Sequence, residues 1–333
     1  MPKEDYIETI PVGPLGIISL KGCSNLGSTV EDYIVDWRNG RNNEHTSTLA
    51  FSGYQRESYH VDVKCPRFGS GEAKCTITST VRGLDLYILV DVCNYSITYN
   101  MNGYVNHMSP DDHYQDLKRV IQACAGKAHR ITVIMPFLYE GRQHKRAGRE
   151  SLDCAVALQE LIHMGVDSII TFDAHDPRVQ NAIPLNNFDT IMPTYQFIKG
   201  ILKNVPDIKM NADNMMIISP DEGAMNRAVY FAGVLGVDVG MFYKRRDYAT
   251  VVNGKNPIVA HEYLGRKLDG KDVIIVDDMI SSGESMLDVA RELKKRNAGR
   301  IFVASTFGLF TDGLDKFDKA YEEGLIHKVI TTN

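Results

Sequence analysis

Two adjacent carboxylates, Asp277 and Asp278, stand between an apolar run and a turn of small polar residues, 281–285. Carboxylates in this position can hold the vicinal hydroxyls of a sugar or a metal-bound sugar. The turn leads into an amphipathic stretch, so the backbone N–H groups and the dipole of a helix N-terminus would stabilise a phosphate there. The segment therefore predicts a site for ribose 5-phosphate, which has a diol at one end and a phosphate at the other.

The residue types around this segment indicate the elements that position it. Residues 273–276 are all β-branched and predict a strand that is buried on both faces. The helix after the turn should bury Met286, Val289, Ala290 and Leu293, because these residues share one face. The turn would then lie at the carboxyl end of a strand, where ligands gather in open α/β sheets.

The remainder of the chain alternates short apolar runs with amphipathic stretches, which predicts an α/β fold with parallel sheets. We expect two similar domains, 15–190 and 191–333, and we expect the second to lack a C-terminal segment. Residues 94–110 and 244–256 are predicted to be loops. Further strands are predicted at residues 16–20, 85–90, 131–135, 168–172, 215–218, 237–241, 301–304 and 326–332, with helices that include 110–124, 151–164, 224–235 and 313–323.

Several polar groups follow predicted strands and should meet at one edge of each sheet. Residues 142–149 are rich in basic side chains, as are residues 244–246. Acidic residues follow two other strands, at 173–176 and 219–223. A single basic run is usually a solvated surface, but two runs near candidate phosphate sites in an acidic protein favour binding of a polyphosphate.

Composition excludes several classes of protein. The chain has 333 residues, 44% of them hydrophobic and 24% charged, and a net charge of −5. This balance is typical of a globular domain and argues against a general nucleic-acid binder. We also expect no membrane association and a cytoplasmic location, because neither a signal peptide nor a long apolar span is evident. The six cysteines form no CxxC pair, and Cys124 and Cys154 are predicted to be buried thiols.

Five blocks of sequence together resemble the ribose-phosphate diphosphokinase family, from about Arg67 to the C-terminus. The last block is shared with phosphoribosyltransferases, whereas the other four are typical of the diphosphokinases. The resemblance implies two domains of phosphoribosyltransferase type and transfer of diphosphate from ATP to the anomeric hydroxyl of ribose 5-phosphate. The blocks are residues 67–72, 142–146, 171–175, 218–223 and 273–286.

The resemblance also implies a role for individual residues and a need for Mg²⁺. Phe68 and Glu72 would reach the adenine pocket of a neighbouring subunit, which requires a homo-oligomer of at least two and as many as six subunits. His175 and Asp221 would help to bind Mg²⁺. The resemblance implies three further sets: Arg142 and Gln143 for ATP, Lys244 and Arg246 on a mobile loop over the reacting phosphates, and Asp277, Asp278, Ser281, Ser282, Gly283, Glu284 and Ser285 for ribose 5-phosphate.

The chain departs from the usual family pattern at three positions, where Ser70, His144 and Ser281 replace aspartates. Two alternatives therefore stay open. A phosphoribosyltransferase that consumes the diphosphate would not need the basic residues 142–146 or the 171–175 block. A non-catalytic regulatory relative would be expected to have lost the cationic loop or the metal ligands, which the chain retains.

Overall fold

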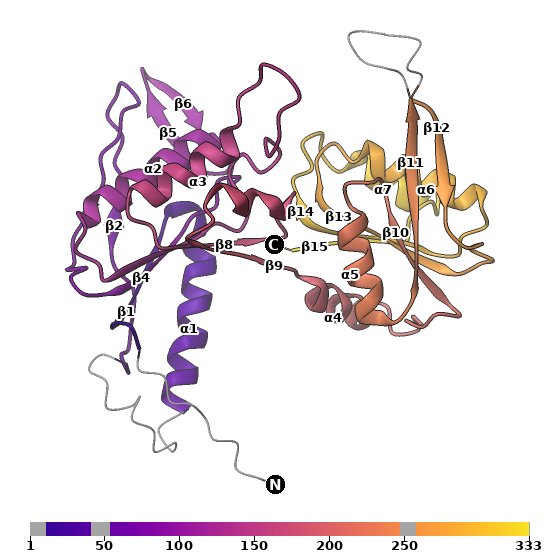
Figure 1. Ribbon diagram of the computed structural model, residues 1–333, viewed down its shortest axis with the longest axis horizontal. Helices are drawn as coiled ribbons and strands as arrows, with labels where there is room; N and C mark the ends of the chain where they lie inside the picture. The colour runs from indigo at the N-terminus through magenta and orange to yellow at the C-terminus, as the bar shows by residue number, and fades with distance from the viewer. Residues whose placement is uncertain (1–10, 41–53, 247–257, 333) are drawn as a thin grey trace. The chain divides into compact units, whose positions relative to one another are not determined.

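The computed structural model describes residues 11–40, 54–246 and 258–332, while the side chains of residues 244–246 and 258–261 fall outside that description. The chain folds into two compact units, residues 1–191 and 192–333. Each unit has its own sheet with helices packed against it (Figure 1). This arrangement confirms the predicted fold class, two α/β domains with mainly parallel sheets.

The first unit is built on a five-stranded sheet in the order β1-β4-β7-β8-β9, in which all neighbours are parallel. Helices α2 and α3 cover one face, where they pack around Ile88, and α1 packs on the other face beside Leu89. The bounds are β1 Leu15–Ser19, α1 Ser24–Gly40, β4 Asp85–Leu89, α2 Pro110–Cys124, β7 Arg130–Ile134, α3 Asp153–His163, β8 Ser168–Phe172 and β9 Asn187–Ile191.

The second unit has a six-stranded sheet in the order β12-β11-β10-β13-β14-β15. Only the β11–β12 pair is antiparallel among these described strands. One face carries α4 and α5, and the other carries α6 and α7. The bounds are α4 Thr194–Asn204, β10 Met215–Ser219, α5 Met225–Leu235, β11 Asp238–Arg246, β12 Ile258–Leu264, β13 Asp272–Ile280, α6 Glu284–Lys295, β14 Ile301–Gly308, α7 Asp315–Glu322 and β15 Lys328–Thr332.

The central strand β13 has the buried environment that its sequence predicts. It lies between β10 and β14, and its β-branched residues, 273–276, are at most 1% exposed. Met286, Val289, Ala290 and Leu293 on α6 are likewise buried, which confirms the predicted apolar face. A strand covered on both faces is a rigid support, so the residues at its carboxyl end are held firmly in place.

Helix α2 begins as the sequence predicts. The Ser109 side chain accepts a hydrogen bond from the Asp112 amide at 3.2 Å, and the Asp112 carboxylate accepts one from the Ser109 amide at 3.0 Å. Pro110 occupies the first turn, where its missing N–H costs nothing. The two reciprocal bonds form a capping box and fix the start of this helix.

Two predictions of loops are wrong. Residues 94–110 contain a hairpin, β5 Thr98–Met101 and β6 Tyr104–His107. Its turn is Asn102-Gly103, with φ values of 51° and 83°, a pair of residues that favours tight hairpins. The predicted loop at 244–256 is wrong for residues 244–246, which continue β11, and its remainder lies outside the described residues. None of the helices among the described residues combines the length and apolarity needed to cross a bilayer.

Candidate active site

Asp277 and Asp278 lie near the carboxyl end of β13, as the sequence predicts. The amide of Asp278 donates a hydrogen bond to Oδ1 of Asp277 at 2.9 Å, so the first carboxylate turns toward its neighbour's backbone. Asp278 is 3% exposed, while the side chain of Asp277 keeps 24% of its surface exposed. Asp277 is therefore the member of the pair that a sugar can reach.

The electrostatics of this pair favour a bound cation or hydroxyl donors. Burial, followed by the charge and hydrogen bonding of Asp278, raises the pKa of Asp277 well above its ordinary value. Arg227 of α5, whose guanidinium lies 3.7 Å from Oδ1 of Asp277, lowers this pKa, and Asp221 raises it further. A cation or the hydroxyls of a sugar would stabilise the ionised carboxylates, because they supply the favourable interactions that burial removes.

The turn after β13 depends on glycine at position 283. Gly283 has a φ of +81°, and a Cβ on it would lie 2.4 Å from the ring of Phe317. It is the N-cap of α6, and among the described residues no side chain caps that helix end. The first N–H groups of a helix have no partner within the helix, so this N-terminus suits an anion.

The flanks of the turn are tied to neighbouring segments. The amide of Thr311 donates to the carbonyl of Ser281 at 3.0 Å, and the two hydroxyls lie 3.4 Å apart. Glu284 is paired with Lys316 at 3.2 Å. Ser282 and Ser285 lie in the same segment, 281–285, which therefore stays in one place relative to β13.

Asp221 lies in the loop after β10, the strand next to β13. Its Oδ1 accepts a hydrogen bond from the amide of Gly223 at 3.0 Å. The hydroxyl of Ser219, the last residue of β10, donates to the backbone carbonyl of Asp221 at 2.6 Å and so links the loop to the strand. The structure thus brings Asp221 together with the Asp277 and Asp278 pair at one edge of the second sheet.

In the first unit, Arg142 and Gln143 lie in the loop after β7. Arg142 is exposed, as a residue that contacts a ligand would be. The side-chain amide of Gln143 donates to the carbonyl of Ser151 at 2.7 Å, and its backbone amide donates to Glu140 at 2.8 Å. In this structure Gln143 therefore links two parts of the loop after β7 by hydrogen bonds.

His144 and His175 lie together in this unit, with ring centroids 5.2 Å apart. Nε2 of His144 is 3.5 Å from Asp176, whereas its Nδ1 is buried without a hydrogen-bond partner among the described residues. Burial and then the nearby His175 and Lys145 lower the pKa of His144, against the opposing effect of Asp176. The lowered pKa favours the neutral form of His144, and a neutral imidazole can bind a metal ion or accept a hydrogen bond.

Phe68 and Glu72 flank the turn of a hairpin made by β2 Val63–Lys64 and β3 Thr76–Ile77. The amide of Phe68 donates to the carbonyl of Glu72 at 2.7 Å. The Phe68 side chain is 51% exposed, so it is not a core residue of its own unit. This exposure agrees with a role in binding, while the hairpin geometry by itself agrees with the simpler prediction of a turn.

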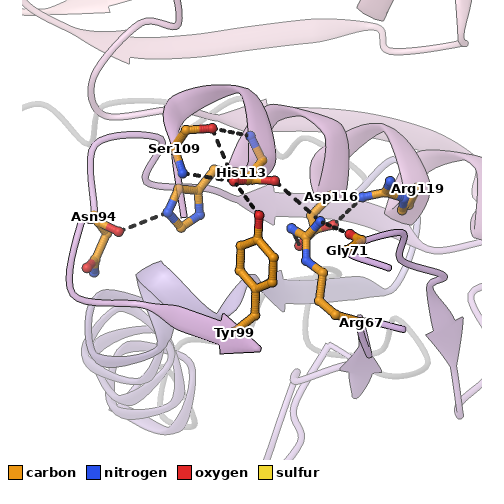
Figure 2. A network of polar contacts seen from close by, with 9 residues as sticks. Arg67, Gly71, Asn94, Tyr99, Ser109, His113, Asp116 and Arg119 are labelled. Carbon is orange, nitrogen blue, oxygen red and sulfur yellow. Dashed lines mark hydrogen bonds and ion pairs between the residues drawn. The ribbon is translucent and has the colours of Figure 1, made fainter. Parts of the chain in front are cut away.

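Arg67 anchors this hairpin to α2, as Figure 2 shows. Its guanidinium lies 3.0 Å from Asp116 and 3.4 Å from Asp112, and it stacks 4.7 Å from the ring centroid of Tyr99. The side chain is only 9% exposed. The sequence did not indicate this anchor, although acidic residues four apart on a helix are a usual partner for one arginine.

Lys244 and Arg246 are in the last part of β11, where they pair in register with His261 and Ile258 of β12. They are therefore strand residues in this structure, and their side chains lie outside the described atoms. The sequence also did not indicate Arg227 and Thr311, because neither lies in a motif and both are positioned by other elements. Within the described part of the chain, no group of three His, Cys, Asp or Glu side chains is arranged to hold a metal ion by itself.

Comparison with known proteins gives two family matches that together cover most of the chain. Residues 15–165 match the model of the N-terminal domain of ribose phosphate pyrophosphokinase, and residues 185–322 match the phosphoribosyl transferase domain. The first match lies within the first compact unit, and the second begins at residue 185, near the end of the first unit, and covers most of the second.

Individual proteins agree with these matches. A ribose-phosphate pyrophosphokinase of Vibrio parahaemolyticus is 30% identical over 75% of this chain and 72% of that protein. The enzyme of the same name from Vibrio cholerae is 29% identical over 82% and 78%. The crystal structure of a phosphoribosylpyrophosphate synthetase from Mycobacterium smegmatis has the same fold, with a TM-score of 0.68, 22% identity, and coverage of 96% of this chain and 88% of that one.

Proposed function

Because this chain belongs to the ribose-phosphate pyrophosphokinase family, we propose that it transfers the diphosphate of ATP to the anomeric hydroxyl of ribose 5-phosphate. The products are 5-phosphoribosyl 1-diphosphate and AMP, and the reaction supplies nucleotide biosynthesis. The observation that carries this proposal over a phosphoribosyltransferase is the match of residues 15–165 to the N-terminal domain of ribose phosphate pyrophosphokinase. The proposed site for ribose 5-phosphate is the end of β13. There a carboxylate pair and the N-terminus of α6 lie on either side of one glycine-containing turn.

Each part of this segment has a task toward ribose 5-phosphate. The carboxylate of Asp277, supported by Asp278, accepts hydrogen bonds from the vicinal hydroxyls of the sugar. The backbone N–H groups at Gly283 and at the start of α6 bind the 5-phosphate, helped by the helix dipole. Sugar and phosphate are thereby fixed at two points, which orients the anomeric hydroxyl toward the reacting phosphorus.

The remaining groups act on ATP. Arg142 and Gln143 hold the nucleotide from the first unit, and Phe68 and Glu72 contact adenine of a neighbouring subunit. Lys244 and Arg246 supply positive charge to the oxygens of the transferred diphosphate, where negative charge changes during reaction. Since in-line phosphoryl transfer needs little covalent help, placement and charge are the main contributions of the protein.

The chain's donor set fits Mg²⁺ as a partner of the substrate phosphates. Mg²⁺ prefers oxygen ligands, keeps several waters, and is usually held by one or two carboxylates together with phosphates. Burial and the neighbouring Asp278 raise the pKa of Asp277, so a cation close to this pair would favour its ionised form. His175 and Asp221 are each proposed to help bind Mg²⁺, which would neutralise phosphate charge.

The proposal includes a homo-oligomer of at least two subunits in the cytoplasm, since an adenine pocket shared between subunits requires a second chain. Two other functions remain as outcomes of experiment. A phosphoribosyltransferase would release diphosphate from the sugar, and a regulatory relative would show no turnover. The match of residues 15–165 to the N-terminal domain of ribose phosphate pyrophosphokinase favours the diphosphokinase over both.

The direct test is to incubate the protein with ATP, Mg²⁺ and ribose 5-phosphate and to separate the nucleotides. The proposal predicts AMP that depends on ribose 5-phosphate. ADP would indicate an ordinary kinase acting on the sugar. If neither AMP nor ADP forms, the phosphoribosyltransferase or the regulatory function is favoured instead.

A further inference from the structure

Two cysteines, Cys65 and Cys75, face each other across the hairpin that carries Phe68 and Glu72. The strands pair Val63 with Ile77 and Lys64 with Thr76, so the next opposed pair is Cys65 and Cys75. The same register continues to the turn, where Arg67 is bridged to Ala73. The register thus brings together two residues separated by nine others in the sequence.

The hydrogen bonds around Cys65 and Cys75 show whether they form a hydrogen-bonded or a non-hydrogen-bonded pair of the antiparallel hairpin. The amide of Thr78 donates to Asp62 at 3.2 Å, and the amide of Lys74 donates to Pro66 at 3.2 Å. In this alternating pattern Cys65 and Cys75 form a non-hydrogen-bonded pair. Such pairs have Cα atoms about 4.5 Å apart, which is within the range of about 4.4–6.8 Å that a disulfide requires.

The two thiols differ from the other four cysteines in their environment. Burial raises the pKa of Cys23, Cys93 and Cys154 to about 12 and that of Cys124 to about 11, so those thiols stay protonated. A hydrogen bond from Cys65 lowers the pKa of Cys75 and raises that of Cys65. Cys75 is therefore the more nucleophilic member of the pair.

The groups around the pair are Cys124, Asp116 and Arg119, all from α2. The charge of Asp116 raises the pKa of both thiols, Arg119 lowers it, and Cys124 raises that of Cys75. Cys65 also lines a cavity of about 330 Å³. Both cysteines are half-buried rather than sealed, so a small oxidant can reach them.

We propose that Cys65 and Cys75 are a modification site, at which hydrogen peroxide forms a reversible disulfide that clamps the β2–β3 hairpin. The thiolate of Cys75 attacks one oxygen of the peroxide and becomes a sulfenic acid, while the other oxygen leaves as hydroxide and takes up a proton. Cys65 then attacks the sulfenic sulfur and displaces water. Two thiols lose two electrons in total, and one peroxide is reduced to two waters.

Cys65 lies three residues before Phe68, and Cys75 lies three residues after Glu72, so the disulfide would join the two strands of their hairpin. In the reduced protein the arms are joined by backbone hydrogen bonds and by Arg67, which also bonds the carbonyl of Gly71 at 3.4 Å. A covalent link restricts the unfolded chain as well, because it closes a loop of eleven residues, 65–75. We therefore expect the oxidised protein to be the more stable form.

Peptide mapping of the intact protein tests the site. Reduced protein is exposed to hydrogen peroxide, its remaining thiols are alkylated, and it is digested with trypsin without reductant. Cleavage after Lys64, Arg67, Lys74 and Arg82 should yield residues 65–67 joined to residues 75–82. Dithiothreitol should separate the two peptides and restore two thiols.

Variants and thermal unfolding complete the test. Cys65→Ser or Cys75→Ser should abolish the linked peptide, whereas Cys124→Ser should leave it intact. Peroxide should raise the unfolding temperature of the wild type by roughly 5 °C and leave that of Cys75→Ser unchanged. The proposal is overturned if both cysteines remain alkylated after peroxide, if Cys75 is linked to Cys124 instead, or if Cys75 is oxidised to a sulfinic acid without a link.

Discussion

The backbone amide of Asp278 donates a hydrogen bond to the carboxylate of Asp277, 2.9 Å away, at the end of a strand that is covered on both faces. This contact fixes one carboxylate beside another that is 3% exposed. Two acids so close and so little hydrated oppose each other's ionisation. The protein therefore keeps two carboxyl groups that oppose joint ionisation at the place where we propose that it binds the ribose diol.

Replacing Asp277 by Asn should stabilise the protein at neutral pH. Because the folded-state pKa of Asp277 is raised, the folded protein holds a proton that the unfolded chain has lost. The ionisation of Asp277 therefore lowers the free energy of unfolding as the pH rises from the ordinary carboxyl range to the folded-state pKa. We expect Asp277→Asn to raise the free energy of unfolding by about 1 kcal/mol at pH 7–8, measured by urea denaturation.

The difference between Asp277→Asn and wild type should shrink as the pH falls below the ordinary carboxyl range, because both proteins are then neutral at this position. The same variant should lose most of its affinity for ribose 5-phosphate. A variant that is less stable than wild type at every pH would show that the pairing of Asp277 with Arg227 outweighs the repulsion within the carboxylate pair.

Gly283→Ala should distort the turn that we propose binds the 5-phosphate. The added Cβ meets a positive φ and the ring of Phe317 at once, so we expect a loss of about 2–4 kcal/mol in stability. Activity should fall chiefly through a higher KM for ribose 5-phosphate. The matched control is Gly324→Ala, since Gly324 also has a positive φ, +67°, but a Cβ there meets open space. Equal effects in the two variants would exclude a special role for the Gly283–Phe317 contact.

Arg67→Ala should weaken the attachment of the β2–β3 hairpin to α2. The change leaves Asp112 and Asp116 without their nearly buried cation and should cost about 3 kcal/mol in urea denaturation. Arg119→Ala is the control, because Arg119 pairs with Asp116 from the same helix and is more exposed than Arg67. If both variants lose the same stability, the contact between hairpin and helix is not what Arg67 supplies.

The sequence was most informative where one residue type leaves few structural options. The β-branched run at 273–276 predicted its buried strand, and Ser109 with Pro110 predicted the start of α2. In both cases the deciding interactions are local or follow from simple periodicity. The paired acids and the glycine turn at the end of β13 could be located for the same reason.

The parts that were missed depend on contacts between segments distant in sequence. Arg67 finds its acids on α2, 45 to 49 residues later, and no local pattern marks that pairing. The mixture of Asn, Gly, Tyr and Met at 94–110 predicts a loop, although Asn102-Gly103 is a hairpin signal and the structure forms the β5–β6 hairpin there. The sequence predicts a loop at Lys244, whereas pairing with β12 extends β11 through this residue.

Lys244→Ala should separate catalysis from binding. We propose that this lysine meets charge that develops only during transfer, so its loss should reduce kcat at least about 100-fold. The KM or Kd for ribose 5-phosphate should change little, since we propose that this substrate binds at β13 and α6. Lys203→Ala on the exposed side of α4 is a suitable control and should behave as wild type. Unchanged kcat in Lys244→Ala would remove this residue from the mechanism.

The fate of the β-phosphate of ATP tests the central claim most directly. The protein is incubated with Mg²⁺, ribose 5-phosphate and ATP labelled at the β-phosphate, and the products are separated. We predict that the label moves to the sugar and that one AMP forms for each labelled sugar, because attack occurs at the β-phosphorus. Label that remains in ADP, with only the unlabelled γ-phosphate on the sugar, would contradict the proposed diphosphate transfer.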